Sequence, residues 1–364
     1  MSKATKVVSW LLVYSGVTAM CNRARQRKQT PRMTILTYHR IGEVNTEGVF
    51  YDPQMISASP AGFEWQMAYI SSHFTVLSLE DIIERFHAGS TLPVNIAAIT
   101  FDDGYHDNYS LAYPILRRFN LPATIFLTTG LVGRADGKAN GFDNDHTNPM
   151  WWDELVFLIA TTQTSTVSVP SLGVLSLESV KDRSRARERL RHHLKLLNDN
   201  DRRTQVDDLK RSLASETHQL PRTPTPLTWE EVREMSHNNI SFGAHTHTHP
   251  ILTRISAEEA EREILLSKKI TENELGTPAR LFAYPNGKKG DFDASIQEML
   301  IRSGFDAAVT LIHGSNQLIK NQLDWYALRR IYVGSDDRRT FMAKVSGALE
   351  MFASRLPLLS QQEY

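Results

Sequence analysis

Two short runs of residues in this chain combine carboxylates and imidazoles in a pattern that suits metal-dependent hydrolysis. The first run is TFDDG at residues 100–104, and the second is HTHTH at residues 245–249. A zinc-like divalent ion is usually held by three His, Asp or Glu side chains, with one position left open for water. We expect Asp103, His245 and His249 to be these three ligands.

The aspartate pair stands at the end of an apolar stretch, residues 96–101, which is typical of a buried strand. Neighbouring residues of a strand point to opposite sides, so Asp103 could bind the metal while Asp102 acts on the water. The same Asp-Asp-Gly sequence also suits an ordinary turn in which Gly104 has a positive φ. By itself, this run therefore does not establish a catalytic site.

The histidine run also follows a short apolar segment, residues 240–244. Histidines four positions apart can share one metal on a turn, and three alternating histidines in five residues are hard to explain by packing. His247 would point away from the other two, so we interpret it as a spare or supporting group. The cluster favours a metal site over a set of core histidines.

Together these runs resemble the motifs of polysaccharide deacetylases, the NodB-homology group also called carbohydrate esterase family 4. Residues 100–104 match the first motif of that family, residues 245–249 its histidine motif, and residues 282–287 (FAYPNG) its proline-glycine motif. Residues 36–41 resemble the first strand of the family. Residues 328–331 resemble a late segment of exopolysaccharide-type members, so the resemblance extends from about residue 33 to about residue 334.

The resemblance implies a metal-dependent removal of acyl groups, usually N-acetyl, from amino sugars in a polymer. Asp102 would be the general base, and the backbone N–H of Tyr105 would help to hold the oxyanion. The implied cofactor is a divalent metal, Zn²⁺ by preference. Tyr284, Pro285 and Asn286 of the proline motif are the expected substrate contacts.

Two positions depart from the family pattern. Better-studied members have an arginine in the proline motif that pairs with the catalytic base, and Ala283 stands at that place here. Another group must then adjust the basicity of Asp102. The family also has a late histidine as general acid, whereas this chain has no histidine after His313, which comes too early for that motif. We interpret His313 as a loop histidine.

Composition predicts an ordinary globular protein. The chain has 364 residues, 41% of them hydrophobic, and its 41 basic and 41 acidic residues give no net charge. Such a balance provides no overall attraction to nucleic acid. The single cysteine, Cys21, cannot form a disulfide within the chain and leaves the redox compartment undetermined.

The amino end differs from this average, because the first 41 residues contain eight lysines and arginines and no acidic residue. Residues 7–21 carry no charge, and 15 residues are too few for a spanning helix, which needs about 20. We expect a helix at residues 1–32 that lies on an anionic membrane face or docks on the domain. A signal peptide is an alternative. A membrane-associated or cell-envelope location is favoured, and a cytoplasmic one is possible.

The 140 residues between the two metal motifs imply an insertion, at about residues 133–225. It should contain a loop at 133–148, a helix opening at Trp151 and Trp152, a hairpin at 166–178 and a helix pair at 181–214. The two tryptophans could stack on sugar rings, or they could pack the insertion onto the catalytic domain.

Around this insertion, predicted strands and helices alternate in the manner of a parallel α/β barrel. The resemblance sharpens the fold to a distorted, incomplete (β/α) barrel of about seven parallel strands. The expected catalytic domain covers residues 33–345, followed by a tail at 346–364. Strands are expected near 33–38, 96–101, 122–127, 240–244, 280–284 and 306–310, and helices near 79–88, 229–236, 257–274 and 293–303.

We therefore predict a metal-dependent deacetylase that acts on an N-acylated amino sugar of a polysaccharide or lipid-linked glycan. One alternative is an amidohydrolase for a non-sugar amide or cyclic imide. Another is a carbohydrate-binding protein that keeps the fold without turnover, an interpretation that Ala283 and the missing late histidine keep open.

Overall fold

The structure is a computed structural model of the full chain. It describes residues 3–27, 30–43, 52–133, 150–213, 226–334 and 336–353. Most of the predicted loop at 133–148 and the end of the predicted tail, from residue 354, lie outside the described residues.

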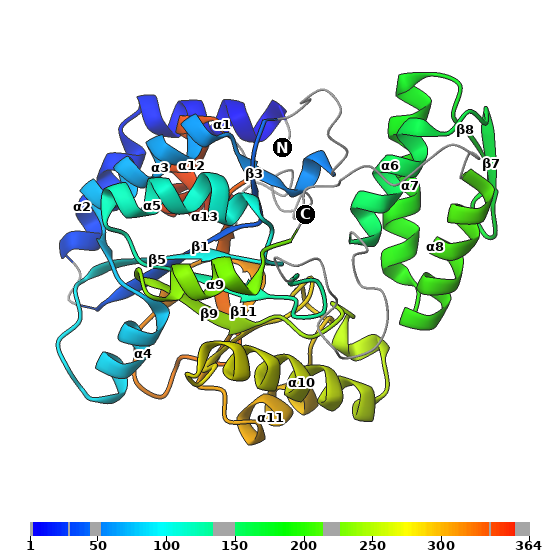
Figure 1. Ribbon diagram of the computed structural model, residues 1–364. Helices are drawn as coiled ribbons and strands as arrows, with labels where there is room; N and C mark the ends of the chain where they lie inside the picture. The colour runs from blue at the N-terminus through cyan, green and yellow to red at the C-terminus, as the bar shows by residue number, and fades with distance from the viewer. Residues whose placement is uncertain are drawn as a thin grey trace.

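Seven parallel strands form a closed barrel at the centre of the molecule (Figure 1). Each strand pairs in parallel with the next in the order β1-β13-β11-β10-β9-β6-β5, and β5 pairs again with β1 through seven consecutive residue pairs. The barrel strands are β1 (Arg32–Tyr38), β5 (Asn95–Phe101), β6 (Ala123–Leu127), β9 (Ile240–Ala244), β10 (Leu281–Ala283), β11 (Ala307–His313) and β13 (Leu328–Tyr332). The predicted barrel of about seven strands is confirmed, although it closes completely rather than remaining incomplete.

The barrel strands read as continuous apolar runs because both of their faces are buried. Residues 96–101 of β5 are all buried. Alternate residues enter different clusters: Ile96 and Ala98 pack with Met33 and Ile35, whereas Ala97 and Ile99 pack with residues of the surrounding helices. One set fills the barrel and the other holds the helical layer, as the period of two requires.

Helices surround the barrel, with α10 and α11 on one side and α3, α5 and α12 on the other (Figure 1). Both α9 and α10 begin with a complete capping box, formed by Thr228 with Glu231 and by Ser256 with Glu259. The surrounding helices are α3 (Pro60–His73), α4 (Leu79–His87), α5 (Tyr113–Phe119), α9 (Trp229–Ser236), α10 (Ala257–Leu275), α11 (Ala294–Arg302), α12 (Arg338–Val345) and α13 (Ala348–Ala353). Short strands complete the domain: β2 (Arg40–Ile41), β3 (Ile56–Ala58), β4 (Thr75–Val76) and β12 (Asn316–Gln317).

The insertion stands beside the barrel and has a small core of its own (Figure 1). It consists of α6 (Trp151–Thr161), a hairpin of β7 (Thr166–Val169) and β8 (Gly173–Ser176), α7 (Val180–Leu196) and α8 (Asp199–Leu213). Leu190 and Leu194 of α7 are fully buried, and Leu209 of α8 and Leu175 of β8 join the same cluster. The hairpin and the helix pair thus form as the residue pattern predicts.

The amino end forms two helices, α1 (Lys3–Tyr14) and α2 (Val17–Arg27), rather than the single helix we expected. They separate at Gly16, whose φ of 74° is one that glycine adopts readily and other residues avoid. Leu12 of α1 packs against Ala343 of α12 and against Ala348 and Leu349 of α13. Within the described part of the chain, no helix is both long and apolar enough to cross a membrane.

Candidate metal and catalytic site

The structure brings Asp103, His245 and His249 together at the carboxyl ends of β5 and β9, where parallel barrels hold their functional groups. One ligand atom from each residue lies within 4.8 Å of the other two. The Asp103 Oδ1 atom is 3.5 Å from His245 Nε2 and 3.4 Å from His249 Nε2. All three side chains are buried.

Local hydrogen bonds orient the ligands and leave the Asp103 oxygens open. His245 Nδ1 lies 2.7 Å from the Ala283 carbonyl oxygen, so the proton belongs on Nδ1 and Nε2 turns its lone pair toward Asp103. Neither carboxylate oxygen of Asp103 has a hydrogen-bond partner, although both are buried. A carboxylate without partners beside two imidazoles is costly unless a cation completes it, and this donor set suits zinc.

The charge states of His249 and Asp103 also suit metal binding. Burial lowers the pKa of His249 to about 3, which keeps this imidazole neutral and able to coordinate. Burial by itself would raise the pKa of Asp103, but the neighbouring imidazoles hold it well below its usual range. The carboxylate is therefore ionised at neutral pH.

The backbone at the ligands is strained, and specific contacts hold it. Asp103, Thr246 and His249 have φ values of 74°, 63° and 61°, in the left-handed region that non-glycine residues seldom adopt. In the histidine run, Glu263 of α10 accepts hydrogen bonds from the His247 and Thr248 N–H groups at 2.7 and 2.8 Å. Glu263 thus fixes the turn that presents His249.

Asp102, the first residue after β5, occupies a contrasting environment. Its two oxygens accept a bidentate pair of hydrogen bonds from Nη1 and Nη2 of Arg330, both 2.7 Å long. Arg330 itself is held by the Thr310 carbonyl at 2.8 Å, and its side chain is fully buried. Burial opposes ionisation of Asp102, but the Arg330 guanidinium lowers its pKa, so this carboxylate is ionised and fixed in orientation.

A third imidazole, His39, lies beside Asp102. Its Nε2 is 3.9 Å from Asp102 Oδ2, and its Nδ1 is buried without a partner. Burial lowers its pKa, although the charges of Asp103 and Asp102 oppose the shift. In the sequence, His39 stands in a segment that resembles the first strand of the family, and nothing in that segment indicates a role for it.

Comparison with known families decides the identity of this barrel. A sequence profile described as polysaccharide deacetylase matches residues 89–161 and 181–308, which is more than half of the chain. The chain belongs to the polysaccharide deacetylase family. The profile covers the segments that carry Asp103, His245 and His249 and extends into the insertion.

Relatives of this family member match parts of its length. It is 22% identical to the Bacillus subtilis protein YxkH over 235 residues, 65% of this chain and 50% of YxkH. It is 33% identical to the Staphylococcus aureus poly-beta-1,6-N-acetyl-D-glucosamine N-deacetylase over 106 residues, 27% of this chain and 36% of that enzyme. The chain thus spans half or less of the length of these relatives.

A solved structure shows the same fold over most of the chain. The Streptococcus pyogenes deacetylase PplD, determined in complex with acetate, superposes with a TM-score of 0.51 at 19% identity. The match covers 83% of this chain and 92% of PplD.

In this polysaccharide deacetylase family member, the arginine beside Asp102 comes from a strand other than the proline motif. Ala283 of β10 and Leu328 of β13 belong to the cluster that fills the barrel, and Phe126 of that cluster lies 5.8 Å from the Arg330 guanidinium. The Ala283 side chain is small, and Arg330 occupies the interior from β13. The sequence at residues 328–331 resembles a family segment and by itself does not indicate that Arg330 pairs with Asp102. A charged residue at an inward-facing strand position was the available signal.

His313 lies at the end of β11 rather than in a loop, and its Nε2 is 3.9 Å from Glu350 of α13. Burial, together with the charges of Lys344 and Arg329, lowers the pKa of His313 to about 4. It is not among the groups that surround Asp102.

The two tryptophans of α6 have different environments. The Trp152 indole N–H donates to the Tyr105 hydroxyl at 2.9 Å, and its ring meets the His249 ring edge-on with centroids 5.1 Å apart. Trp151 packs on the core of the insertion, with the Arg202 guanidinium 5.9 Å from its ring. Trp152 therefore borders the metal site, whereas Trp151 belongs to the insertion.

The proline motif is only partly placed for substrate contact. Tyr284 is 1% exposed, stacks on Phe292 and donates its hydroxyl proton to the Tyr326 carbonyl, so its side chain is a core element. The prediction that this side chain binds substrate is corrected: Tyr284 follows the last residue of β10, and its ring packs in a buried cluster with residues of α11. Pro285 is buried, and Asn286 is half-buried with a φ of 59°.

The insertion approaches the histidine turn through positively charged side chains. Arg203 of α8 donates to the Thr248 hydroxyl at 3.2 Å, and Arg191 of α7 lies 3.8 Å from Asp52. Burial, with the charges of Arg191 and Lys288, lowers the pKa of Lys195 to about 8. His247 does not join the ligands, as expected, and its Nδ1 is 3.0 Å from the Thr129 hydroxyl.

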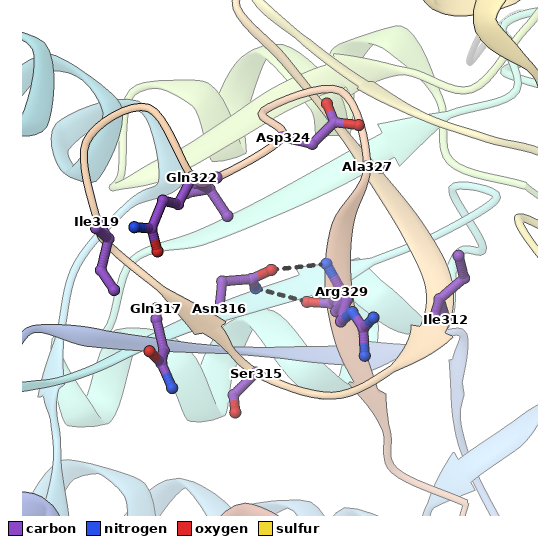
Figure 2. Close-up of a pocket in the computed structure, with 10 residues that line it drawn as sticks. Ile312, Ser315, Asn316, Gln317, Ile319, Gln322, Asp324, Ala327 and Arg329 are labelled. Atoms are coloured by element: carbon purple, nitrogen blue, oxygen red, sulfur yellow. Dashed lines mark hydrogen bonds between the residues drawn. The ribbon is translucent and has the colours of Figure 1, made fainter.

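A recess of about 420 Å³ lies on the outside of the barrel wall rather than at this site (Figure 2). Arg329 lines it, whereas the next residue of β13, Arg330, points into the barrel. Figure 2 shows Asn316 joined to the Arg329 backbone by two hydrogen bonds, of 2.8 and 2.9 Å. The recess contains no histidine or pair of carboxylates, and we assign it no part in catalysis.

Proposed function

We propose that this protein is a metal-dependent deacetylase that hydrolyses N-acetyl groups on the amino sugars of a polysaccharide or a lipid-linked glycan. The observation that carries the proposal is the pair of adjacent aspartates with different surroundings. Asp102 is held ionised by Arg330, and Asp103 faces His245 and His249 with both oxygens open. A base and a set of metal ligands therefore stand side by side.

Asp103, His245 and His249 are the residues that would hold the ion, and their donor set favours Zn²⁺. Such an ion acts as a Lewis acid on a carbonyl oxygen and makes water a better nucleophile at neutral pH. The three protein ligands leave room for further coordination, as a catalytic site requires.

The surrounding residues supply the proton transfers. Asp102 accepts the proton of the attacking water, and Arg330 keeps the carboxylate in its basic form and in a fixed orientation. His39, whose Nε2 is 3.9 Å from Asp102, can take up the proton that Asp102 accepts from water and pass it to the leaving amine nitrogen. In the described part of the chain no carbonyl accepts from the Tyr105 N–H, which leaves it for the developing oxyanion.

The family relationship supports a glycan substrate. The Staphylococcus aureus relative is a poly-beta-1,6-N-acetyl-D-glucosamine N-deacetylase, and PplD was determined with acetate, the product expected of such a reaction. Asn286 offers a half-buried amide to a substrate, and Trp152, which is 6% exposed, supports the site by packing on His249. The presence of Arg330 and His39 argues against a protein that binds glycan without turnover.

The test is acetate release by the full chain from N-acetylglucosamine polymers, before and after removal of metal by a chelator and after addition of Zn²⁺. We expect chelation to abolish release and Zn²⁺ to restore it. His249→Ala should be inactive, whereas the exposed His237→Ala serves as the matched control and should remain active.

Undiminished acetate release after complete metal removal would contradict the proposal. Binding of glycan by the metal-loaded protein without acetate release would indicate a binding protein. Hydrolysis of cyclic imides or other non-sugar amides, with none of the acetylated glycans cleaved, would indicate the alternative amidohydrolase.

A further inference from the structure

Helix α1 is docked on the domain through one face only. Ser9 is fully buried, Leu12 is 4% exposed, and Val8 packs with them against the α12 and α13 cluster. These positions are spaced as one face of a helix should be. For a helix that merely caps a domain, the opposite face should be polar.

The opposite face of α1 is apolar instead. Val7, Trp10, Leu11 and Tyr14 recur at the spacing i, i+3, i+4, i+7 and are 58%, 44%, 53% and 64% exposed. We call these four residues the α1 stripe. Trp10 and Tyr14 pack on each other with ring centroids 4.7 Å apart, and Met20 of α2 adds a side chain that is 66% exposed. Contiguous exposed apolar side chains of this kind mark an interaction surface.

Positive charge surrounds the α1 stripe. Lys6, Arg23 and Arg27 are exposed on α1 and α2, and neither helix contains an acidic residue. From α12, Arg339 lies 5.6 Å from the centre of the Tyr14 ring. Two described carboxylates lie at this end of α12: Asp337 is half-buried and caps the helix, and Asp336 is exposed and accepts a hydrogen bond from the Ser59 N–H.

We propose that the α1 stripe docks this protein onto an anionic lipid bilayer, with α1 lying in the plane of the interface. Tryptophan and tyrosine suit the headgroup level because each has an apolar body and a polar tip. The basic groups beside the stripe suit anionic lipids. A second copy of the chain is a less suitable partner for the α1 stripe than a bilayer. A symmetric contact would bring the positive charges of the two copies together.

Co-sedimentation of the full chain with lipid vesicles tests the proposal. We expect binding to vesicles that contain phosphatidylglycerol, weaker binding to pure phosphatidylcholine, and release at high salt. The triple variant Trp10→Ser, Leu11→Ser, Tyr14→Ser should lose at least about tenfold in affinity. The double variant Arg23→Gln, Arg27→Gln should lose about 25-fold in affinity at low salt, since each basic group contributes about a fivefold factor.

The matched control carries three serines at other exposed apolar positions, Val174, Val180 and Leu196, which are 68%, 86% and 60% exposed. This variant should bind vesicles as the original protein does. Equal losses in the stripe and control variants would overturn the proposal, as would vesicle binding that ignores lipid charge. A concentration-dependent dimer that the stripe variant abolishes, with no vesicle binding, would assign the surface to a second copy instead.

A second measurement keeps the proposal testable if the stripe variant fails to fold. Brominated lipids quench only tryptophans that enter the bilayer, and the unsubstituted protein can be used. We expect partial quenching that Trp10→Phe removes, a change that conserves the apolar surface. Quenching that persists in Trp10→Phe, or none in the original protein, would contradict docking through α1. Acetate release from a soluble substrate should not change in these variants, so this test is independent of the proposed catalytic function.

Discussion

The two halves of the site differ in how completely the protein satisfies its own polar groups. On the base half, Asp102 receives two hydrogen bonds from Arg330, and Arg330 is held in turn by Thr310. On the ligand half, both oxygens of Asp103 lack partners, and His249 sits on strained backbone. The fold itself supplies the hydrogen-bond partners of the base, Asp102. The oxygens of Asp103, by contrast, are left for a bound cation. The two carboxylates are adjacent in sequence but have different surroundings, because β5 ends at Phe101 and the chain turns at Asp103, whose φ is 74°.

Removing the partner of the base should produce the largest effect on this comparison. Arg330→Met leaves a buried carboxylate without compensation, so we expect a loss of about 3–5 kcal/mol in the free energy of unfolding. Acetate release should fall by orders of magnitude, because Asp102 loses its fixed orientation and burial then favours its protonated form, which cannot accept a proton. Denaturant unfolding and initial rates measure the two effects.

The adjacent Arg329→Met is the matched control, because this side chain is exposed on the outer face of β13. Its effect should stay within about 0.5 kcal/mol. An equal loss of unfolding free energy in both variants would show that the pairing of Asp102 with Arg330 does not stabilise this part of the site.

A smaller effect is expected from the support of the ligand half. Glu263→Gln weakens the contacts to the His247 and Thr248 N–H groups, and should cost about 1–3 kcal/mol in unfolding free energy. Because Glu263 fixes the turn before His249, metal affinity should fall more than kcat of the metal-saturated enzyme. Glu261→Gln, at an exposed position of the same helix, should change neither the unfolding free energy nor the metal affinity. A similar loss in this variant would contradict a specific role for the contacts of Glu263.

The smallest effect concerns the boundary between the site and the insertion. Trp152→Phe removes the hydrogen bond to the Tyr105 hydroxyl, for which we expect a cost of about 0.5–1.5 kcal/mol and a raised KM for glycan. Trp151→Phe should leave KM unchanged, since its ring packs inside the insertion. A raised KM in Trp151→Phe alone would reverse this assignment.

The parts of the account that rest on local sequence were predictable. The buried strands, the capped helices and the metal-type spacing of the histidines each depend on a few neighbouring residues. The pairing of Arg330 with Asp102 was not predictable from local sequence. The two residues are 228 positions apart, and only the closed barrel brings β13 to β5. The role of His39 depends on the same closure.

Other differences arose where a local signal was read too broadly. Gly16 has the residue type that ends a helix, yet the uncharged stretch suggested one continuous helix. The proline motif predicts Tyr284 at the substrate, whereas its ring packs in the core just after β10 ends. In both cases the backbone geometry of one residue decided the outcome.

Metal binding and turnover measured together in two neighbouring variants test the central claim most directly. Asp103→Asn and Asp102→Asn should be compared by metal content after dialysis against Zn²⁺ and by acetate release at saturating metal. The account predicts that Asp102→Asn keeps the metal and loses most turnover, because an amide cannot accept the proton, whereas Asp103→Asn loses metal and turnover alike. Equal metal loss in both variants, or turnover retained in Asp102→Asn, would contradict the division between base and ligand.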